Sequence, residues 1–372
     1  MSPPRFRTLR PLAALALALA GVTLAPSSVA ADEPDVRASV VQSGLVNPWD
    51  VAFAPDGRMF VTERPGRIRV YRSAAPGAAL LRTFRVPDVR AQGEAGLMGL
   101  ALDPAFASNG YLYVCASRTQ QQAWVNQLLR YRVSSTSAFT FDRYVIRDGM
   151  TAASIHDGCA LEFGRDGKLY VSMGDAADDA AAQNPNVLNG KILRVNGNGS
   201  VPTDNPIMPG ATRRTAVFSM GHRNPQGIAI HPVNGRRYAA EHGPEYDDEV
   251  NLLIPGGNYG WPAMTGPAAV AGFRDPCWAS GRPTIATSGA AFARTANWGD
   301  FRNQLFVTTL KDQDVRRMSV TADGRTCTQE GGLFNGTFGR LRAIVSGASG
   351  YLFVTTSNGS NDRVIRLVPV LP

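Results

Sequence analysis

The sequence predicts an all-β protein built as a single six-bladed β-propeller. One pattern recurs six times: an apolar run, a turn around Pro-Asp-Gly or a similar sequence, a second apolar run, and a third strand of basic and apolar residues. The runs are short, rich in Val, Ile, Phe and Tyr, and bounded by Gly or Pro, which is typical of strands. No helical period persists beyond about two turns. Copies spaced by roughly 50 to 65 residues match the propeller class, in which each repeat is a small antiparallel sheet.

The six copies follow one another along the chain. Their paired first and second strands are expected in residues 49–64, 96–118, 158–175, 227–240, 288–311 and 340–359. Their third strands are expected in residues 66–72, 127–133, 190–196, 249–254, 314–320 and 362–368. Residues 37–45 precede the first copy, and we expect them to form the outer strand of the last blade. That pairing would close the ring and hide a sheet edge.

The first 31 residues are predicted to be a secretory signal peptide. Arg5, Arg7 and Arg10 form a basic segment, residues 12–24 an apolar run, and residues 28–30 a small-residue cleavage site. The mature chain would then be one propeller domain, residues 32–372, in a secreted or extracytoplasmic location. No later segment is apolar enough to predict a membrane span.

The charge of the chain argues against nucleic acid as a partner. The formal net charge is +8, and loss of three arginines with the signal peptide leaves about +5 (8 − 3). The lysines are few and scattered, at positions 168, 191 and 311. A mild excess without a basic tract is not the electrostatic footprint of a nucleic-acid-binding surface.

The four cysteines are compatible with two disulfides in an exported protein. None of them has the C-x-x-C spacing of a zinc or redox site. Of the three possible pairings we favour Cys277 with Cys327 and Cys115 with Cys159. For the second pair, two free buried thiols stay open as the alternative.

Functional groups of a propeller gather around the central channel, on the loops that lead into each repeat. The residues at these positions, together with Lys311 at the end of a middle strand, are Glu94, His156, Asp157, Arg223, Asn224, Thr284, Arg340 and Arg342. One histidine and four cations at one channel would suit a ligand with several negative charges and a proton acceptor. Taken singly, His156 also fits a structural hydrogen-bonding role. His222 and His231 are interpreted as structural.

A metal site is suggested by the loop that begins at Gly243 and Pro244 and continues to Asp247, Asp248 and Glu249. Such a loop can offer main-chain carbonyls and carboxylates together, which suits a hard cation such as Ca²⁺. An ordinary acidic surface loop is the alternative.

At these residues the chain resembles the soluble quinoprotein sugar dehydrogenases, the glucose/sorbosone dehydrogenase family that includes the aldose sugar dehydrogenases. The resemblance runs from about Gly44 to Leu367. The motifs that carry it are GHRNPQG at residues 221–227, EHGPEYDDEVN at 241–251, GGNYGWP at 256–262, GLMGLALDP from 96, HDGCALEFGRDGKLYVSMGD from 156, PTIATSG from 283 and GRLR from 339.

This resemblance implies a six-bladed propeller that binds pyrroloquinoline quinone (PQQ) and Ca²⁺ in its channel and oxidises aldose sugars. It implies that His156 is the catalytic base, that Arg223 acts with Asn224 at the reactive end of the quinone, and that Glu94 and Asp157 lie near the substrate. Its remaining implied contacts are Asn224, Thr284, Lys311, Arg340 and Arg342 for the quinone, and Gly243 and Pro244, with Asp248 of the following acids, for the metal. The partners would be an aldose and an external electron acceptor, and a homodimer is possible.

The chain departs from the family pattern at three positions, where it has Asp157, Thr287 and Ala343. The first could alter the sugar contacts, because Asn or Gln is common there. Two rival functions are a calcium-dependent lactonase and a binding propeller that has lost its cofactor. Cations rather than carboxylates at the channel disfavour the first, and the intact set of implied site residues disfavours the second.

Overall fold

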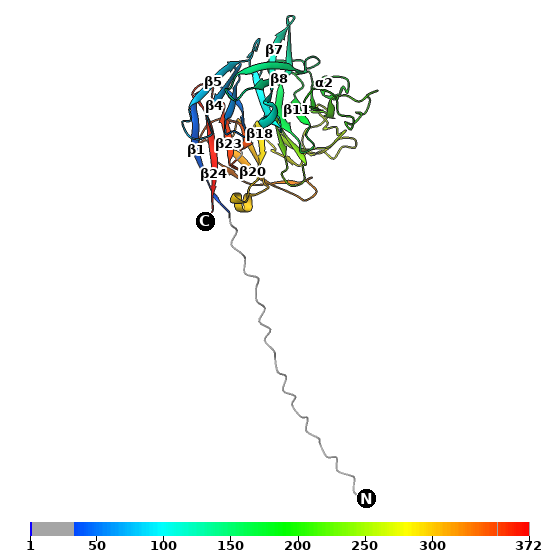
Figure 1. The fold of residues 1–372 in the computed structure, drawn as a ribbon. Helices are drawn as coiled ribbons and strands as arrows, with labels where there is room; N and C mark the ends of the chain where they lie inside the picture. The colour runs from blue at the N-terminus through cyan, green and yellow to red at the C-terminus, as the bar shows by residue number, and fades with distance from the viewer. Residues whose placement is uncertain (2–32, 348, 372) are drawn as a thin grey trace. The chain divides into compact units, whose positions relative to one another are not determined.

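The computed structural model describes residues 33–347 and 349–371, together with Met1. The predicted signal peptide therefore lies outside the described residues, apart from Met1. In the described chain the strands form six four-stranded sheets, and neighbouring strands within each sheet are antiparallel. The prediction of a six-bladed propeller is confirmed (Figure 1).

Each blade runs in chain order from its innermost strand outward. Blades 1 to 3 are β2 (Pro48–Phe53), β3 (Met59–Glu63), β4 (Arg67–Tyr71) and β5 (Leu80–Arg85); β6 (Leu97–Leu102), β7 (Tyr111–Gln120), β8 (Ala123–Val133) and β9 (Phe139–Ile146); β10 (Gly158–Phe163), β11 (Leu169–Met173), β12 (Lys191–Val195) and β13 (Val217–Met220). Blades 4 and 5 are β14 (Pro225–Ile230), β15 (Arg237–Glu241), β16 (Glu249–Leu253) and β17 (Trp278–Ala279); β18 (Thr287–Phe292), β19 (Leu305–Thr309), β20 (Val315–Val320) and β21 (Cys327–Leu333).

Blade 6 joins the two ends of the described chain. It consists of β22 (Leu341–Ser346), β23 (Leu352–Thr356), β24 (Asp362–Val370) and, as its outer strand, β1 (Asp35–Leu45). Asp35 pairs with Val370 and Leu45 with Asp362, so β1 and β24 lie side by side (Figure 1). This confirms that residues 37–45 supply the outer strand of the last blade.

In the part of the chain that the structure describes, helical structure is limited to short segments between strands. These are α1 (Phe106–Asn109), α2 (Asp179–Gln183) and the 3₁₀ segment η1 (Ala296–Phe301). Within the described residues, no helix has the length and apolar character needed to cross a bilayer.

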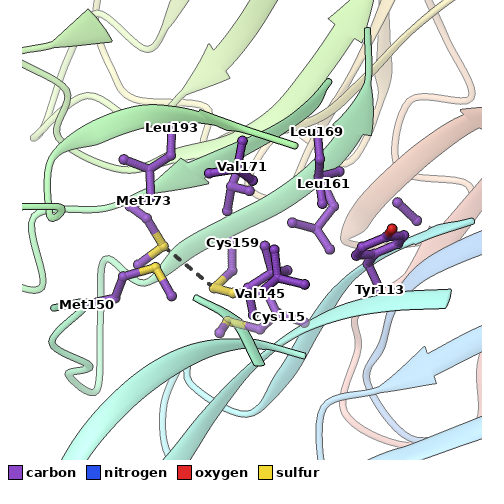
Figure 2. Packing of buried hydrophobic residues seen from close by; sticks show 14 of the residues in the cluster. Tyr113, Cys115, Val145, Met150, Cys159, Leu161, Leu169, Val171, Met173 and Leu193 are labelled. Carbon is purple, nitrogen blue, oxygen red and sulfur yellow. Dashed lines mark hydrogen bonds between the residues drawn. A yellow bond between two sulfur atoms is a disulfide. The ribbon is translucent and has the colours of Figure 1, made fainter. Parts of the chain in front are cut away.

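Apolar side chains fill the spaces between adjacent blades. Between blades 2 and 3, Val145, Met150, Leu161 and Met173 surround the Cys115–Cys159 disulfide, which joins β7 to β10 (Figure 2). The second disulfide, Cys277–Cys327, joins the loop before β17 to β21. Both favoured pairings are confirmed, and burial of the sulfurs makes them part of the core.

The six innermost strands bring the ends of the blades together. β2, β6, β10, β14, β18 and β22 contact one another in a closed ring. All six begin at the same end of that ring, because each blade repeats the same up-and-down order. Residues just before these strands, and residues just after each second strand, are therefore neighbours at one mouth of the channel.

Candidate functional site

A cavity of about 510 Å³ lies at this mouth, and four of its lining side chains are cationic. Its charged and titratable lining residues are Arg64, Glu94, His242, Lys311, Arg340 and Arg342. Arg64, Lys311, Arg340 and Arg342 are permanent cations, and Glu94 supplies one carboxylate. Burial lowers the pKa of His242, and the charge of Glu94 opposes this effect. Such a cavity can bind a ligand that carries several carboxylates.

Arg64 and His242 were not among the predicted site residues. Arg64 directly follows β3 and His242 directly follows β15, so each occupies the end of the second strand of its blade. Lys311 lies just beyond the end of β19, after Leu310, and its prediction used this signal in blade 5 alone. Applied to every repeat, the same signal would have found both residues.

Three nitrogen atoms around the cavity and its neighbouring loop are buried and have no hydrogen-bond partner within the described residues. They are Nε of Arg64, Nε of Arg223 and Nε2 of His242. A buried donor without a partner is costly, and native proteins rarely leave one unless a ligand or water completes it. The donor set therefore fits an anionic, acceptor-rich group such as PQQ.

Glu94 anchors the residues around the cavity. Its Oε2 atom accepts hydrogen bonds from the backbone N–H of His156 at 2.9 Å, from Asn224 Nδ2 at 3.1 Å and from Gln226 Nε2 at 3.2 Å. Burial alone would raise the pKa of Glu94, but His242, Arg342 and these hydrogen bonds hold it below its ordinary value. Glu94 is thus an ionised brace for the site.

His156 is held in a defined orientation by Asp175. Nδ1 of His156 lies 2.8 Å from Oδ1 of Asp175, and the Asp175 side chain is fully buried. The carboxylate accepts a hydrogen bond from Nδ1–H, which leaves Nε2 of His156 as the ring atom able to accept a proton. Asp175 was not predicted as a site residue, although it too follows the second strand of its blade.

The backbone of His156 is unusual and closely packed. His156 and Cys159 have positive φ values of 62° and 67°. A Cβ atom on Gly174 would overlap the carbonyl oxygen of His156, so the close approach of these two segments requires glycine. The chain around His156 therefore departs from regular strand geometry.

Arg223 contacts the loop that was predicted to bind a metal. Its Nη1 donates to the carbonyl oxygen of Gly243 at 2.9 Å, and its guanidinium carbon lies 5.2 Å from the ring centre of Trp261. Arg223, Gly243 and Pro244 share a small cavity of about 10 Å³ with His242 and Trp261. The structure thus brings the predicted cation and the predicted carbonyl ligands together.

Asp248 and Thr284 are placed where they hold this loop. Oδ1 of Asp248 accepts from Gly243 N–H at 3.0 Å, and Oδ2 accepts from the Thr284 hydroxyl at 2.8 Å and from the N–H of Ala286 at 2.9 Å. Because Asp248 is fully buried and both oxygens are engaged, it braces the loop and is not an open metal ligand. Neither residue lines the cationic cavity.

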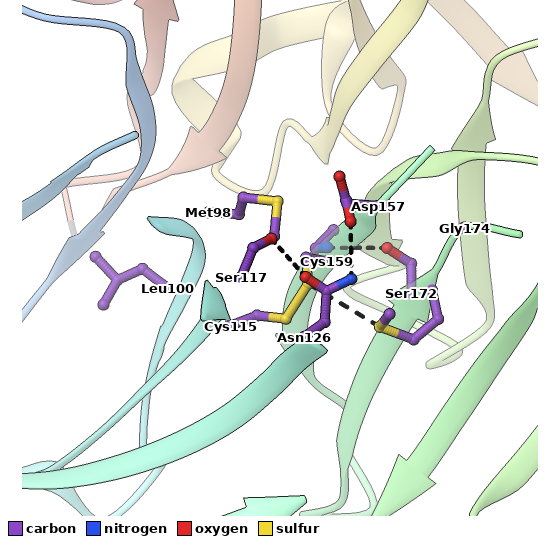
Figure 3. The surroundings of a disulfide bond; sticks show 12 residues. Met98, Leu100, Cys115, Ser117, Asn126, Asp157, Cys159, Ser172 and Gly174 are labelled. Carbon is purple, nitrogen blue, oxygen red and sulfur yellow. Dashed lines mark hydrogen bonds between the residues drawn. A yellow bond between two sulfur atoms is a disulfide. The ribbon is translucent and has the colours of Figure 1, made fainter. Parts of the chain in front are cut away.

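Asp157 is also placed away from the cavity, beside the Cys115–Cys159 disulfide (Figure 3). Its Oδ1 accepts from Asn126 Nδ2 at 2.9 Å and from Ala153 N–H at 3.1 Å. Its side chain has no exposed surface, so the predicted substrate contact does not agree with this geometry. Burial raises the pKa of Asp157 to about 7.

Asn224 links the two halves of the site. Its Oδ1 accepts from Gly158 N–H at 3.1 Å, while its Nδ2 donates to Glu94. It is fully buried, as is His222, which bonds Glu241 and Ser219 at 2.8 Å each. The structural interpretation of His222 therefore agrees with its contacts.

Comparison with known proteins places the chain among sugar dehydrogenases. Residues 45–366 match the family model described as glucose/sorbosone dehydrogenase. The aldose sugar dehydrogenase YliI of Escherichia coli (strain K12) is 32% identical over 346 residues, covering 88% of this chain and 91% of that protein. The quinoprotein glucose dehydrogenase B of Acinetobacter calcoaceticus is 32% identical over 277 residues, covering 67% of this chain and 57% of that protein.

Solved structures give the same result. The apo form of the soluble aldose sugar dehydrogenase from Escherichia coli superimposes with a TM-score of 0.81 at 32% identity, covering 90% of this chain and 100% of that one. The PQQ-bound aldose sugar dehydrogenase from Streptomyces coelicolor gives a TM-score of 0.77 at 29% identity, with coverage of 91% and 100%.

Proposed function

Because the chain belongs to the glucose/sorbosone dehydrogenase family, we propose that it is a quinoprotein that oxidises the C1 hydroxyl of aldose sugars to lactones. The observation that carries this proposal is the cavity with four cationic side chains, whose lining residue Glu94 accepts a hydrogen bond from the backbone N–H of His156. When bound there, PQQ would supply the acceptor for the hydride that leaves C1, and an external acceptor would then take the electrons.

The residues that would hold PQQ are the cavity cations Arg64, Lys311, Arg340 and Arg342. An arginine can donate two parallel hydrogen bonds to one carboxylate, so these side chains provide both charge and orientation. Burial lowers the pKa of Arg342 to about 10, and the nearby carboxylate of Glu94 opposes this effect. Arg342 therefore stays charged at neutral pH.

The proton of the C1 hydroxyl would be taken by Nε2 of His156. Asp175 stabilises the imidazolium that forms, and its hydrogen bond to Nδ1 keeps the required tautomer. Arg223 adds a fixed positive charge beside the Gly243 carbonyl, where it can stabilise negative charge that develops during oxidation. General bases and such fixed charges typically contribute about 10²- to 10⁴-fold each.

A Ca²⁺ ion fits this site only through main-chain oxygens. Within the described residues, no group of three or more His, Cys, Asp or Glu side chains is arranged to hold a metal. We therefore propose the carbonyls of Gly243 and Pro244 as its protein ligands, with the remaining ligands supplied by PQQ, and assign Asp248 to support the loop. An ion bound there would act as a Lewis acid.

A reconstitution experiment tests the proposal. Purified apo-protein is mixed with PQQ and Ca²⁺, and reduction of an artificial dye is followed after an aldose is added. We expect reduction that requires all three additions. Lactone hydrolysis without PQQ would indicate a lactonase instead, and neither activity would indicate a binding propeller. The disulfides and the predicted signal peptide support a secreted or extracytoplasmic protein.

A further inference from the structure

We propose that Trp261 is a positioning residue that couples the histidine base to the arginine of the site. This inference rests on the proposed dehydrogenase activity, but it starts from contacts that no part of that proposal used. Trp261 lies in the loop between β16 and β17, far in sequence from His156 and Asp175.

The indole N–H of Trp261 completes the hydrogen bonding of Asp175. It donates to Oδ2 of Asp175 at 2.9 Å. The other oxygen, Oδ1, already accepts from Nδ1 of His156 and from the backbone N–H of Ala177, both at 2.8 Å. The carboxylate is fully buried, so each of its oxygens depends on these partners.

Arg223 packs over the face of the same indole ring. The guanidinium carbon lies 5.2 Å from the ring centre, within the range of a cation–π interaction. Trp261 therefore contacts Asp175, the hydrogen-bond partner of His156, through its ring edge, and it contacts Arg223 through its ring face. Movement of the ring would disturb both groups together.

The ring is fixed by its own main chain. The backbone N–H of Trp261 donates to Gly221 O at 3.0 Å, and its carbonyl oxygen accepts from Nε2 of Gln183 at 2.6 Å. Gln183 ends α2, the short helix that follows the Asp175 segment, so the loop carrying Trp261 is tied to the segment carrying Asp175. This double attachment is what a positioning role requires.

Trp261→Phe tests the inference because it removes the N–H but keeps a ring for Arg223. Without that donor, Oδ2 of Asp175 is left unpaired, the carboxylate can rotate, and the tautomer of His156 is less strictly held. We expect kcat to fall about tenfold, equivalent to 1.4 kcal/mol. The KM for the aldose and the Kd for PQQ should stay within about twofold.

Trp124→Phe is the matched control. Within the described residues the indole nitrogen of Trp124 has no hydrogen-bond partner, and Arg90 lies 4.2 Å from its ring centre. The control therefore removes the indole N–H of a tryptophan that also packs against an arginine, and it leaves the contacts of Asp175 unchanged. It should leave kcat unchanged.

A spectroscopic measurement on apo-protein separates positioning from general stability. The chain has four histidines, so selective ¹⁵N labelling gives few signals, and His156→Gln assigns the one of interest. Long-range ¹H–¹⁵N spectra report which ring nitrogen carries the proton. We expect a single Nδ1-protonated tautomer in the parent protein and in Trp124→Phe, and a mixture in Trp261→Phe.

Unchanged His156 ¹⁵N shifts in Trp261→Phe, or an equal loss of kcat in the Trp124 control, would overturn the inference. If the parent protein showed no dye reduction, the dehydrogenase proposal would fail, while the spectra would still decide the role of Trp261. Should Trp261→Phe not fold, Asp175→Asn serves instead. It should shift the Trp261 indole N–H resonance and leave the Trp124 resonance in place, and an unmoved Trp261 signal would count against the coupling.

Discussion

The guanidinium carbon of Arg342 lies 3.8 Å from the ring centre of Trp49, the first blade's inner-strand tryptophan. Nη1 of Arg342 also donates to Oε1 of Gln226 at 2.8 Å. The stacking and the hydrogen bond hold this buried arginine in place. Its neighbour Arg340 is more exposed and reaches the carbonyl of Leu310 at 3.3 Å. The two arginines thus contribute differently to one cavity.

Replacing both arginines, as Arg340→Gln with Arg342→Gln, should weaken PQQ binding. A hydrogen bond to a charged group is worth roughly 1.5 to 3 kcal/mol. Two lost contacts should raise the Kd by about two to four orders of magnitude, measured by titrating apo-protein with PQQ and following recovered dye reduction. Lysine at both positions should recover binding only in part, because it cannot stack on Trp49 or donate in a fork. A PQQ titration midpoint equal to that of the parent protein would show that these two arginines do not bind the cofactor.

Arg64→Gln should weaken PQQ binding by about tenfold or more, because it removes a cavity cation whose Nε has no hydrogen-bond partner among the described residues. The same titration measures the effect. Arg302→Gln is the control, since Arg302 is exposed and does not line the cavity. Equal midpoints for both variants would show that Arg64 does not contact the cofactor.

His156→Gln should lower kcat by about 10²- to 10⁴-fold, because glutamine cannot accept the C1 hydroxyl proton. The Kd for PQQ should change little, since His156 is not one of the cavity cations. Steady-state kinetics with saturating PQQ, together with the titration, separate the two effects. Turnover equal to that of the parent protein would exclude His156 as the base.

Removal of Ca²⁺ with a chelator should reduce activity and Tm together in the PQQ-loaded protein. A ligand bound only by the folded state adds RT ln(1 + [L]/Kd) to stability, about 2.7 kcal/mol at 100 times the Kd. Dye reduction and thermal unfolding are measured before chelation, after it, and after Ca²⁺ or Mg²⁺ is returned. A chelator that left both quantities unchanged would contradict the Gly243–Pro244 assignment.

Asp157→Asn should change how stability depends on pH. Burial raises the pKa of Asp157 from 3.8 to about 7, so the folded protein keeps a proton that the unfolded chain has lost. The resulting stability is fully present below about pH 4 and is lost as the pH rises through about 7. The variant lacks this loss, and its Tm relative to the parent should rise by at least about 2 °C between pH 5 and pH 8.

Asp300→Asn is the control for that experiment, because Asp300 is exposed. Asp50 and Glu249, whose pKa values burial raises to about 7 and about 8, are present in every protein compared. Their contributions therefore cancel in the difference. A Tm difference that stayed constant with pH would show that Asp157 is ionised throughout.

The repeat pattern predicted the blades, the closing strand and the cationic mouth, because these follow from strand period and from the position of each loop in its repeat. The direction in which the Asp157 side chain points could not be predicted in this way. The positive φ values at His156 and Cys159 break the alternation that assigns side chains to faces. The role of Asp248 depends on N–H groups from Gly243 and Ala286, which lie in separate loops. The contacts of Trp261 likewise depend on tertiary packing.

Pairing of β1 with β24 also sets the timing of folding during synthesis. Five blades are complete in chain order as the polypeptide lengthens, but the sixth needs residues 362–370 beside residues 35–45. β1 and β24 are separated by almost the whole described chain, so blade 6 cannot be completed before residues 362–370 have been made. Until then the edge of β1 is unpaired. Closure of the ring therefore depends on contacts between two segments that lie far apart in sequence, and such contacts carry a high loop-closure entropy cost.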